Sequence, residues 1–251
     1  MKGNWRCRAA LAVSLFLVCT GANAGPPYVT DDPQPVSWRH WELYVSLTGQ
    51  SEAGSRSGDA PHFEANFGAA PGLQLHLIVP LSYARPPGGS TAYGPGDVEF
   101  GAKYRFVEES GSFPQIGVFP LVELPSGDAS RGLGTGEVRV FLPVWIQKSF
   151  GKWTTYGGGG YWINPGAGNR NWWLAGWQAQ VQLTSSFAPG VEVYYQSPAE
   201  AGARPKVLYN IGFVLDFGEH HHLLASAGGA FTGCNCRQAY FAYLLTLGPK
   251  S

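Results

Sequence analysis

The sequence predicts an all-β protein: a transmembrane antiparallel up-and-down β-barrel of about twelve strands, preceded by a signal peptide. The first observation is the stretch 96–108, GDVEFGAKYRFVE, which alternates between an apolar face and a face that carries four charged residues. The second is that similar segments recur about twelve times. The third is that their connections alternate between long and short, as in outer-membrane barrels, which turn the apolar face to lipid and the polar face to the lumen.

Composition supports strands over helices. The chain has 35 glycines and 14% aromatic residues among its 251 positions, which favours strands and turns. After residue 24 no apolar stretch approaches the ~18 residues of a membrane-spanning helix, so any membrane span must consist of strands. A secreted β-sandwich is the alternative fold, although its outer faces rarely carry so many glutamines and carboxylates opposite complete apolar rows.

The N-terminal region reads as a signal peptide followed by a leader. Basic residues precede an apolar run at 9–19, and Ala22-Asn23-Ala24 forms a cleavage site, so we assign the signal peptide to 1–24. A proline-rich segment, GPPYVTDDPQPV, follows, and we expect 25–37 to be an extended, solvated leader. Residues 38–251 are assigned to the barrel.

Twelve alternating runs then follow one another along the chain. They are 38–48, 62–69, 73–81, 96–108, 114–124, 137–147, 153–163, 173–184, 191–196, 206–217, 223–231 and 240–247. Polar or Gly/Pro-rich stretches at 49–61, 84–96 and 125–136 predict long loops, and Ala70-Pro71-Gly72 predicts a tight turn. Tryptophans close to the strand ends predict two interfacial girdles: Trp38, Trp41, Trp145 and Trp153 at one end, and Trp162, Trp172 and Trp173 at the other.

The polar faces of these runs predict the lumen lining. The residues are His40, Glu42, Glu64, His76, Asp97, Glu99, Lys103, Arg105, Glu123, Glu137, Arg139, Gln178, Gln180, Gln182, Glu192, Lys206, Asn210 and Asp216. Neighbouring strands bring cations near carboxylates. Such a set either lines a thin water path or closes it as an ion-pair network.

Cysteine and histidine patterns give weak signals for metal chemistry. Cys234 and Cys236 predict a loop disulfide or unpaired thiols, with a soft metal as the less favoured alternative, because two ligands do not complete a zinc site. Consecutive side chains at 220–222 splay apart, so these three histidines predict a solvated turn. We expect no metal and no cofactor.

Other functional classes find little support. Without its first 24 residues the chain keeps 17 acidic and 14 basic residues, which offers no basic patch for nucleic acid. The glycines of 132–137, GLGTGE, precede a strand and not the helix that a dinucleotide site requires. No G-x-S-x-G motif occurs, and a lipid-modifying enzyme is the least favoured function.

Three patches resemble one family: the leader GPPYVTDDPQPV with Trp41-Glu42 after it, the stretch GPGDVEFGAKYRF, and the loop LPSGDASRGLGTGEV. They are similar to outer-membrane proteins associated with the meta-cleavage pathway of phenol degradation, which are labelled as transporters. The resemblance implies a β-barrel in the outer membrane of a Gram-negative bacterium that passes small molecules, with aromatic ones as candidates.

We therefore expect a passive outer-membrane channel for small solutes, in contact with the lipid bilayer and not an enzyme. The alternative is a non-conducting structural or adhesive barrel whose outer loops bind a partner. The sequence indicates neither the solute nor the oligomeric state.

Overall fold

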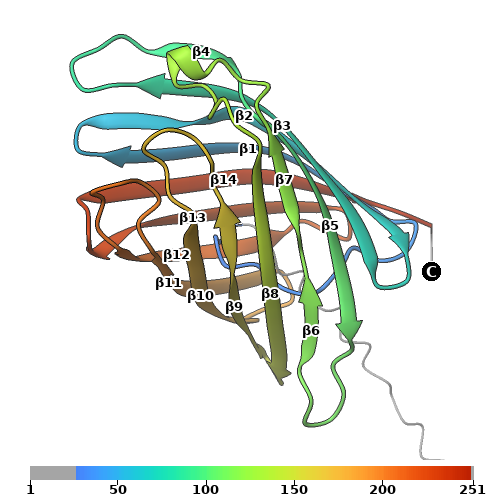
Figure 1. Cartoon of the computed structure of the whole chain (residues 1–251). Helices are drawn as coiled ribbons and strands as arrows, with labels where there is room; N and C mark the ends of the chain where they lie inside the picture. Colours follow the sequence, from blue (N-terminus) through green and yellow to red (C-terminus); the bar gives the residue numbers. More distant parts are fainter. Residues whose placement is uncertain (1–26, 250–251) are drawn as a thin grey trace, which may run out of the picture.

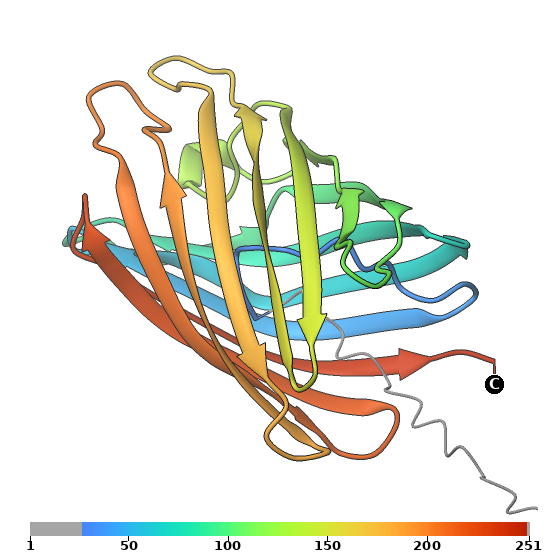
Figure 2. The same cartoon turned by 90° about the horizontal axis from the view of Figure 1, so that it is seen from below.

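The computed structural model describes residues 27–249, which form one closed antiparallel β-barrel (Figures 1 and 2). The predicted signal peptide, 1–24, lies outside the described residues. In chain order the elements are β1 (Trp41–Glu52), β2 (Ser55–Ala70), β3 (Leu73–Arg85), β4 (Ala92–Pro95), β5 (Val98–Val107), β6 (Gln115–Val118), β7 (Leu121–Leu124), η1 (Ala129–Arg131), β8 (Arg139–Phe150), β9 (Trp153–Ile163), β10 (Trp172–Val181), β11 (Phe187–Gln196), β12 (Lys206–Asp216), β13 (His221–Thr232) and β14 (Cys236–Leu247). Among residues 27–249, no helix has the length and apolarity that crossing a membrane requires.

These strands make twelve passes around the barrel, which confirms the predicted fold class. The short strand β4 only extends the sheet at one end of β3. β6 and β7 are two halves of one pass, interrupted at Phe119-Pro120, and both pair with β5 and β8. Pairing of β1 with β14 along their whole length closes the ring.

The two ends of the barrel are distinct. We call the end where β1 begins and β14 finishes the inner end, because Trp41 and Leu247 are register partners there. The opposite end, which holds the connections after β3, β7, β9 and β11, is the outer end. In outer-membrane barrels the shorter turns lie on the periplasmic side, so the inner end corresponds to the periplasm.

Alternation of side chains gives the barrel wall an apolar outside and a mainly polar inside. Trp177 and Ile211 expose 55% and 62% of their surfaces, whereas the adjacent Gln178 and Asn210 are buried. In water such a continuous apolar exterior would promote aggregation, but in a bilayer it meets acyl chains.

One predicted loop is instead strand. The stretch 49–61 extends β1 and β2 beyond the expected strand ends, and only Ala53 and Gly54 turn the chain between them. Both residues have positive φ, 51° and 87°, as a two-residue type I′ hairpin requires. The polar composition of this stretch reflects a hairpin with polar side chains on both faces.

Three of the predicted girdle tryptophans face inward. Trp145 and Trp162 are buried, and Trp172 stacks on Trp162 with ring centroids 5.6 Å apart. They join Phe119 and other apolar residues in a cluster on the inside of the wall. Closeness to a strand end sets the depth of a residue in the membrane, but odd or even position along the strand sets its face.

A substitution on the lipid side tests this assignment of faces. Ile211 lies midway along β12, so Ile211→Arg should lower the free energy of unfolding in lipid vesicles by about 2–4 kcal/mol. Phe217→Arg, at the inner end of the same strand, should cost about 0–1 kcal/mol because the side chain reaches the interface. Urea titration of the folded, heat-modifiable gel band measures both variants. Equal costs at the two positions would contradict the lipid-facing assignment.

Candidate functional site

The leader crosses the lumen. The backbone N–H groups of Val29 and Thr30 donate to the Glu192 carboxylate at 3.0 and 2.8 Å, and Ser226 donates to the Pro27 carbonyl. Thr30 and Asp32 are fully buried. The expectation of a solvated leader is therefore wrong for this part of the segment, which runs inside the barrel (Figure 2). Its backbone groups find partners on the barrel wall.

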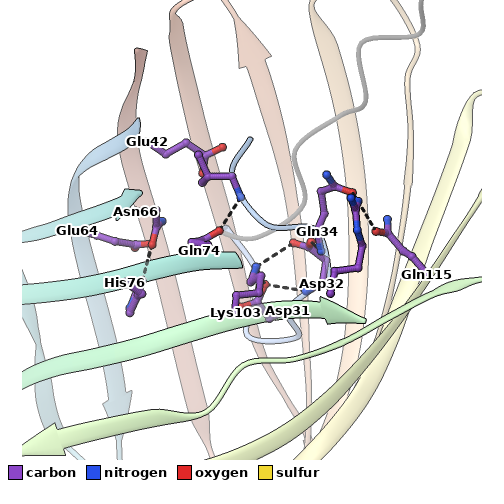
Figure 3. Close-up of polar contacts among 12 residues, drawn as sticks. Asp31, Asp32, Gln34, Glu42, Glu64, Asn66, Gln74, His76, Lys103 and Gln115 are labelled. Atoms are coloured by element: carbon purple, nitrogen blue, oxygen red, sulfur yellow. Dashed lines mark hydrogen bonds and ion pairs between the residues drawn. The ribbon is translucent and has the colours of Figure 1, made fainter. Parts of the chain in front are cut away.

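A buried ion pair fixes the middle of the leader. The Lys103 Nζ of β5 lies 3.0 Å from Asp31 Oδ1 and 3.6 Å from Asp32 Oδ2, and Figure 3 shows the three side chains converging. Burial raises the pKa of the Asp32 carboxyl well above its ordinary value, while the Lys103 charge opposes this effect. One lysine thus holds two neighbouring carboxyl groups inside the barrel.

Polar groups near the inner end hold the rest of the leader. Gln74 accepts a hydrogen bond from the Val36 backbone N–H at 2.9 Å. Arg105 donates to the side-chain Oε1 atom of Gln34 at 2.6 Å and to that of Gln115 at 3.3 Å. The leader is therefore held mainly by hydrogen bonds and charges.

Close approach of the leader to the wall needs a glycine. Gly176 lies on β10 opposite Thr30, and a Cβ at this position would collide with the threonine hydroxyl. On either side of it, β10 carries larger residues. A glycine at this point of the strand gives Thr30 the room to reach the wall.

A row of charged residues follows the wall toward the outer end. Across β2, β3, β5, β7 and β8 the direct register partners are Glu64, Ile78, Glu99, Glu123 and Arg139. Two carboxylates, Glu99 and Glu123, thus stand side by side, and Arg139 forms an ion pair with Glu123.

His76 links this row to the deeper part of the lumen. It is buried, with Nε2 3.0 Å from Glu99 Oε1 and Nδ1 2.6 Å from Asn66 Oδ1 (Figure 3). Its Nδ1 also lies 3.6 Å from the Glu64 carboxylate. A histidine between two carboxylates can offset negative charge by binding a proton.

The other side of the lumen carries an uncharged polar row. Gln115, Gln147, Tyr156 and Gln178 are successive register partners across β6, β8, β9 and β10, and the row continues to Glu192 on β11. All are buried. This row faces the leader, and it accounts for much of the polar surface in the middle of the barrel.

An outer loop folds back over the lumen. Asp97 accepts hydrogen bonds from the backbone N–H groups of Gly127 and Thr135 at 2.9 and 2.7 Å, and from the Thr135 hydroxyl at 2.8 Å. Leu133, in the same loop, is buried. Within this loop Asp128 caps η1, and its hydrogen bonds with Ser130 hold the pKa of the Asp128 carboxyl below its ordinary value.

Leader, wall and loop together line an open cavity of about 550 Å³. Its base includes residues 27–29 of the leader, and residues 132–135 of the outer loop lie on another side. Its charged lining consists of Asp59, His62, Asp97, Glu99, Glu123 and Arg139. The cavity is large enough for a small solute with its water.

Most of the predicted lumen residues lie on the inside of the wall. These are Glu42, Glu64, His76, Asp97, Glu99, Lys103, Arg105, Glu123, Arg139, Gln178, Gln180, Glu192, Asn210 and Asp216. His40 and Lys206 lie at opposite ends of the barrel, bonded to the Trp38 carbonyl and the Glu52 carboxylate.

Two further predicted positions, Glu137 and Gln182, lie beyond strand ends and away from the lumen. Glu137 is exposed and precedes β8, and Gln182 follows β10 and donates to the Thr184 carbonyl at 2.8 Å. Beyond a strand end, alternation no longer fixes the direction of a side chain. Neither residue therefore lines the middle of the lumen.

Sequence reasoning missed the leader residues that fill the lumen. Asp31 and Asp32 stand between prolines in a stretch that reads as linker, and nothing local indicates Lys103 or Glu192 as partners. A usable signal was the pair of adjacent carboxylates, together with an excess of polar residues on the inward face.

The predicted cysteine pair lies at the outer end. Cys234, in the connection after β13, forms a disulfide with Cys236, the first residue of β14. The Glu52 carboxylate lies beside the two sulfur atoms. A disulfide has no thiolate to offer, so this group in its oxidised form is not a metal site.

Comparison with known proteins points to outer-membrane barrels. No protein-family model matches the chain, and no curated protein does. An outer-membrane channel from Pseudomonas putida F1 is similar in structure, with a TM-score of 0.61 and 15% identity over 85% of this chain and 97% of that one. The KdgM porin in complex with disordered oligogalacturonate has a TM-score of 0.54 and 9% identity, over 80% of this chain and 98% of that one. The translocator domain of the autotransporter NalP from Neisseria meningitidis has a TM-score of 0.53 and 10% identity, over 82% of this chain and 87% of that one. These likenesses show the fold.

The Lys103 ion pair should control whether the leader stays in place. Removing one partner of a buried ion pair costs about 3–5 kcal/mol, so Lys103→Met should expose the leader and raise maleimide labelling of a Thr30→Cys variant by about tenfold or more. Val29→Cys, at an exposed leader position, should label in either background. Lys152→Met, at an exposed position, is the matched control. Unchanged protection at position 30 would show that the ion pair does not hold the leader.

The Asp97 carboxylate should hold the outer loop over the lumen. Because a hydrogen bond to a charged group contributes about 1.5–3 kcal/mol, Asp97→Ala should release the loop and speed tryptic cleavage after the exposed Arg131 by about tenfold. Glu137→Ala removes an exposed acid close to the same loop and should leave the rate as in the unaltered protein. Equal cleavage of both variants would mean that other contacts hold the loop.

Proposed function

We propose that this protein is a passive channel for small solutes in the outer membrane of a Gram-negative bacterium. The observation that carries the proposal is a cavity of about 550 Å³, lined in part by charged side chains, inside a barrel whose outside is apolar. Similarity to a channel and to a porin of known structure supports it. We further propose that residues 1–24 are a cleaved signal peptide that directs export.

Passage through this barrel depends on the leader. Residues 27–36 lie between the cavity and the inner end, and they are held by Glu192, Lys103 and Gln74. Water can replace these polar contacts when the leader shifts, whereas the buried Pro33 and Val36 oppose the shift. Small solutes then pass when the leader moves aside or through the space beside it.

The choice of solutes for the first tests follows from the sequence, which resembles outer-membrane proteins associated with phenol degradation. The inward aromatic cluster of Phe119, Phe141, Trp145 and Trp162 is buried and does not line the cavity, so it plays no part in this choice. From the resemblance we propose small aromatic molecules as the first solutes to test.

A second candidate function is a non-conducting barrel that serves a structural or adhesive role. The leader favours it, because its buried ion pair with Lys103 occupies the lumen. The similarity in fold to an autotransporter translocator domain is compatible with that reading. In this case the outer loops would bind a partner.

Single-channel recording separates the two functions. The refolded protein should carry a small current in planar bilayers, and Lys103→Met should raise its conductance by about twofold or more, because a displaced leader widens the water path. Lys152→Met, far from the leader contacts, should leave the conductance as it was. Absence of current from the wild type and from Lys103→Met, across several salt concentrations, would favour the non-conducting barrel.

A further inference from the structure

The lumen holds many more carboxyl groups than cationic groups. Ten carboxyl groups lie inside among the described residues: Asp31, Asp32, Glu42, Asp59, Glu64, Asp97, Glu99, Glu123, Glu192 and Asp216. Three permanently charged cations face them, namely Lys103, Arg105 and Arg139. Even with His62 and His76 protonated, the carboxyl groups outnumber the cations that the protein supplies.

The position of two of these groups is more informative than the total. Glu99 and Glu123 are direct register partners on β5 and β7, and both line the cavity. Like charges directly opposite on neighbouring strands destabilise a sheet. Arg139 pairs with Glu123 and His76 with Glu99, so one permanent cation serves the two carboxylates.

A separate observation concerns acceptor oxygens on the leader side. Asp32 Oδ2 and the side-chain oxygens of Gln178 and Tyr156 are buried and have no hydrogen-bond partner among residues 27–249. Buried polar atoms of this kind are normally satisfied by water or an ion. The same set includes the donor atoms Arg105 Nε and Arg139 Nε, so it calls for water in the lumen, and the sign of the preferred ion is set by the net charge of the lining.

From these observations we infer that the lumen passes cations and small cationic solutes in preference to anions, and that Glu99 and Glu123 set this preference. The inference rests on the proposed channel function. Inside a cavity with low-dielectric walls, net negative charge concentrates cations and repels anions. The ligand class is a hard monovalent or divalent cation, or an alkylammonium group, because carboxylate oxygens bind both.

The reversal potential of the wild-type channel tests the sign of the selectivity. In a tenfold KCl gradient across a planar bilayer, the potential should show K⁺ to be at least about threefold more permeant than Cl⁻. The Glu99→Gln/Glu123→Gln variant should lose this preference and shift toward Cl⁻, because Arg139 then keeps its charge without a partner. Glu200→Gln, an exposed position on the connection after β11, is the matched control and should keep the wild-type value.

The outcomes separate this inference from the channel function. A wild type that conducts but favours Cl⁻, or favours neither ion, overturns the inference and leaves the channel standing. Failure of both the wild type and Lys103→Met to conduct overturns both. Loss of the heat-modifiable gel shift would mean that the double variant does not fold. In that case the sign of the wild-type reversal potential and the reversal potential of the single variant Glu99→Gln test the inference.

Discussion

A bilayer offers no hydrogen-bond partners, and the whole structure depends on this constraint. It drives polar side chains to the inside of the wall, where they in turn need partners that a ring of twelve strands supplies only in part. The leader meets that need: its backbone N–H groups bond to Glu192, and its carboxyl groups surround Lys103. The outer loop does the same for Asp97. Lipid therefore requires a wall with polar side chains on its inside, and those side chains bind the leader and the outer loop within the lumen.

Two different kinds of interaction organise the lumen. Toward the outer end, charged residues such as Glu99, Glu123 and Arg139 surround an open cavity. In the middle, the leader is packed against an uncharged row that includes Tyr156 and Gln178. The first arrangement leaves space for a solute, whereas the second fills it. The cavity and the segment that obstructs the lumen thus follow one another along the barrel axis, so the leader is the point of control in the proposed channel.

Strand alternation predicts much of this structure and fails where its physical basis ends. Odd and even positions place Lys103 and Glu192 inside correctly, because a pleated strand leaves a side chain only two directions. The same rule says nothing of Glu137, which lies outside a strand, and composition misleads at 49–61, where a hairpin has polar side chains on both faces. The bond between Thr30 and Glu192 spans 162 positions in the sequence, so no local pattern contains it.

Continuity of the leader with β1 has a further consequence. Residues 38–40 turn the chain at the inner end, where the Arg39 and Gly68 backbones are hydrogen-bonded, so the last residues of the leader lie next to the inner end of the barrel. The leader behaves as a tethered ligand whose effective concentration is set by the length of the tether, on the order of millimolar for a short flexible one. Its occupancy is then independent of how many copies of the protein the membrane holds. A modest loss in the affinity of the leader for the lumen would leave some molecules with the leader bound and others with it released, without any change in the barrel itself.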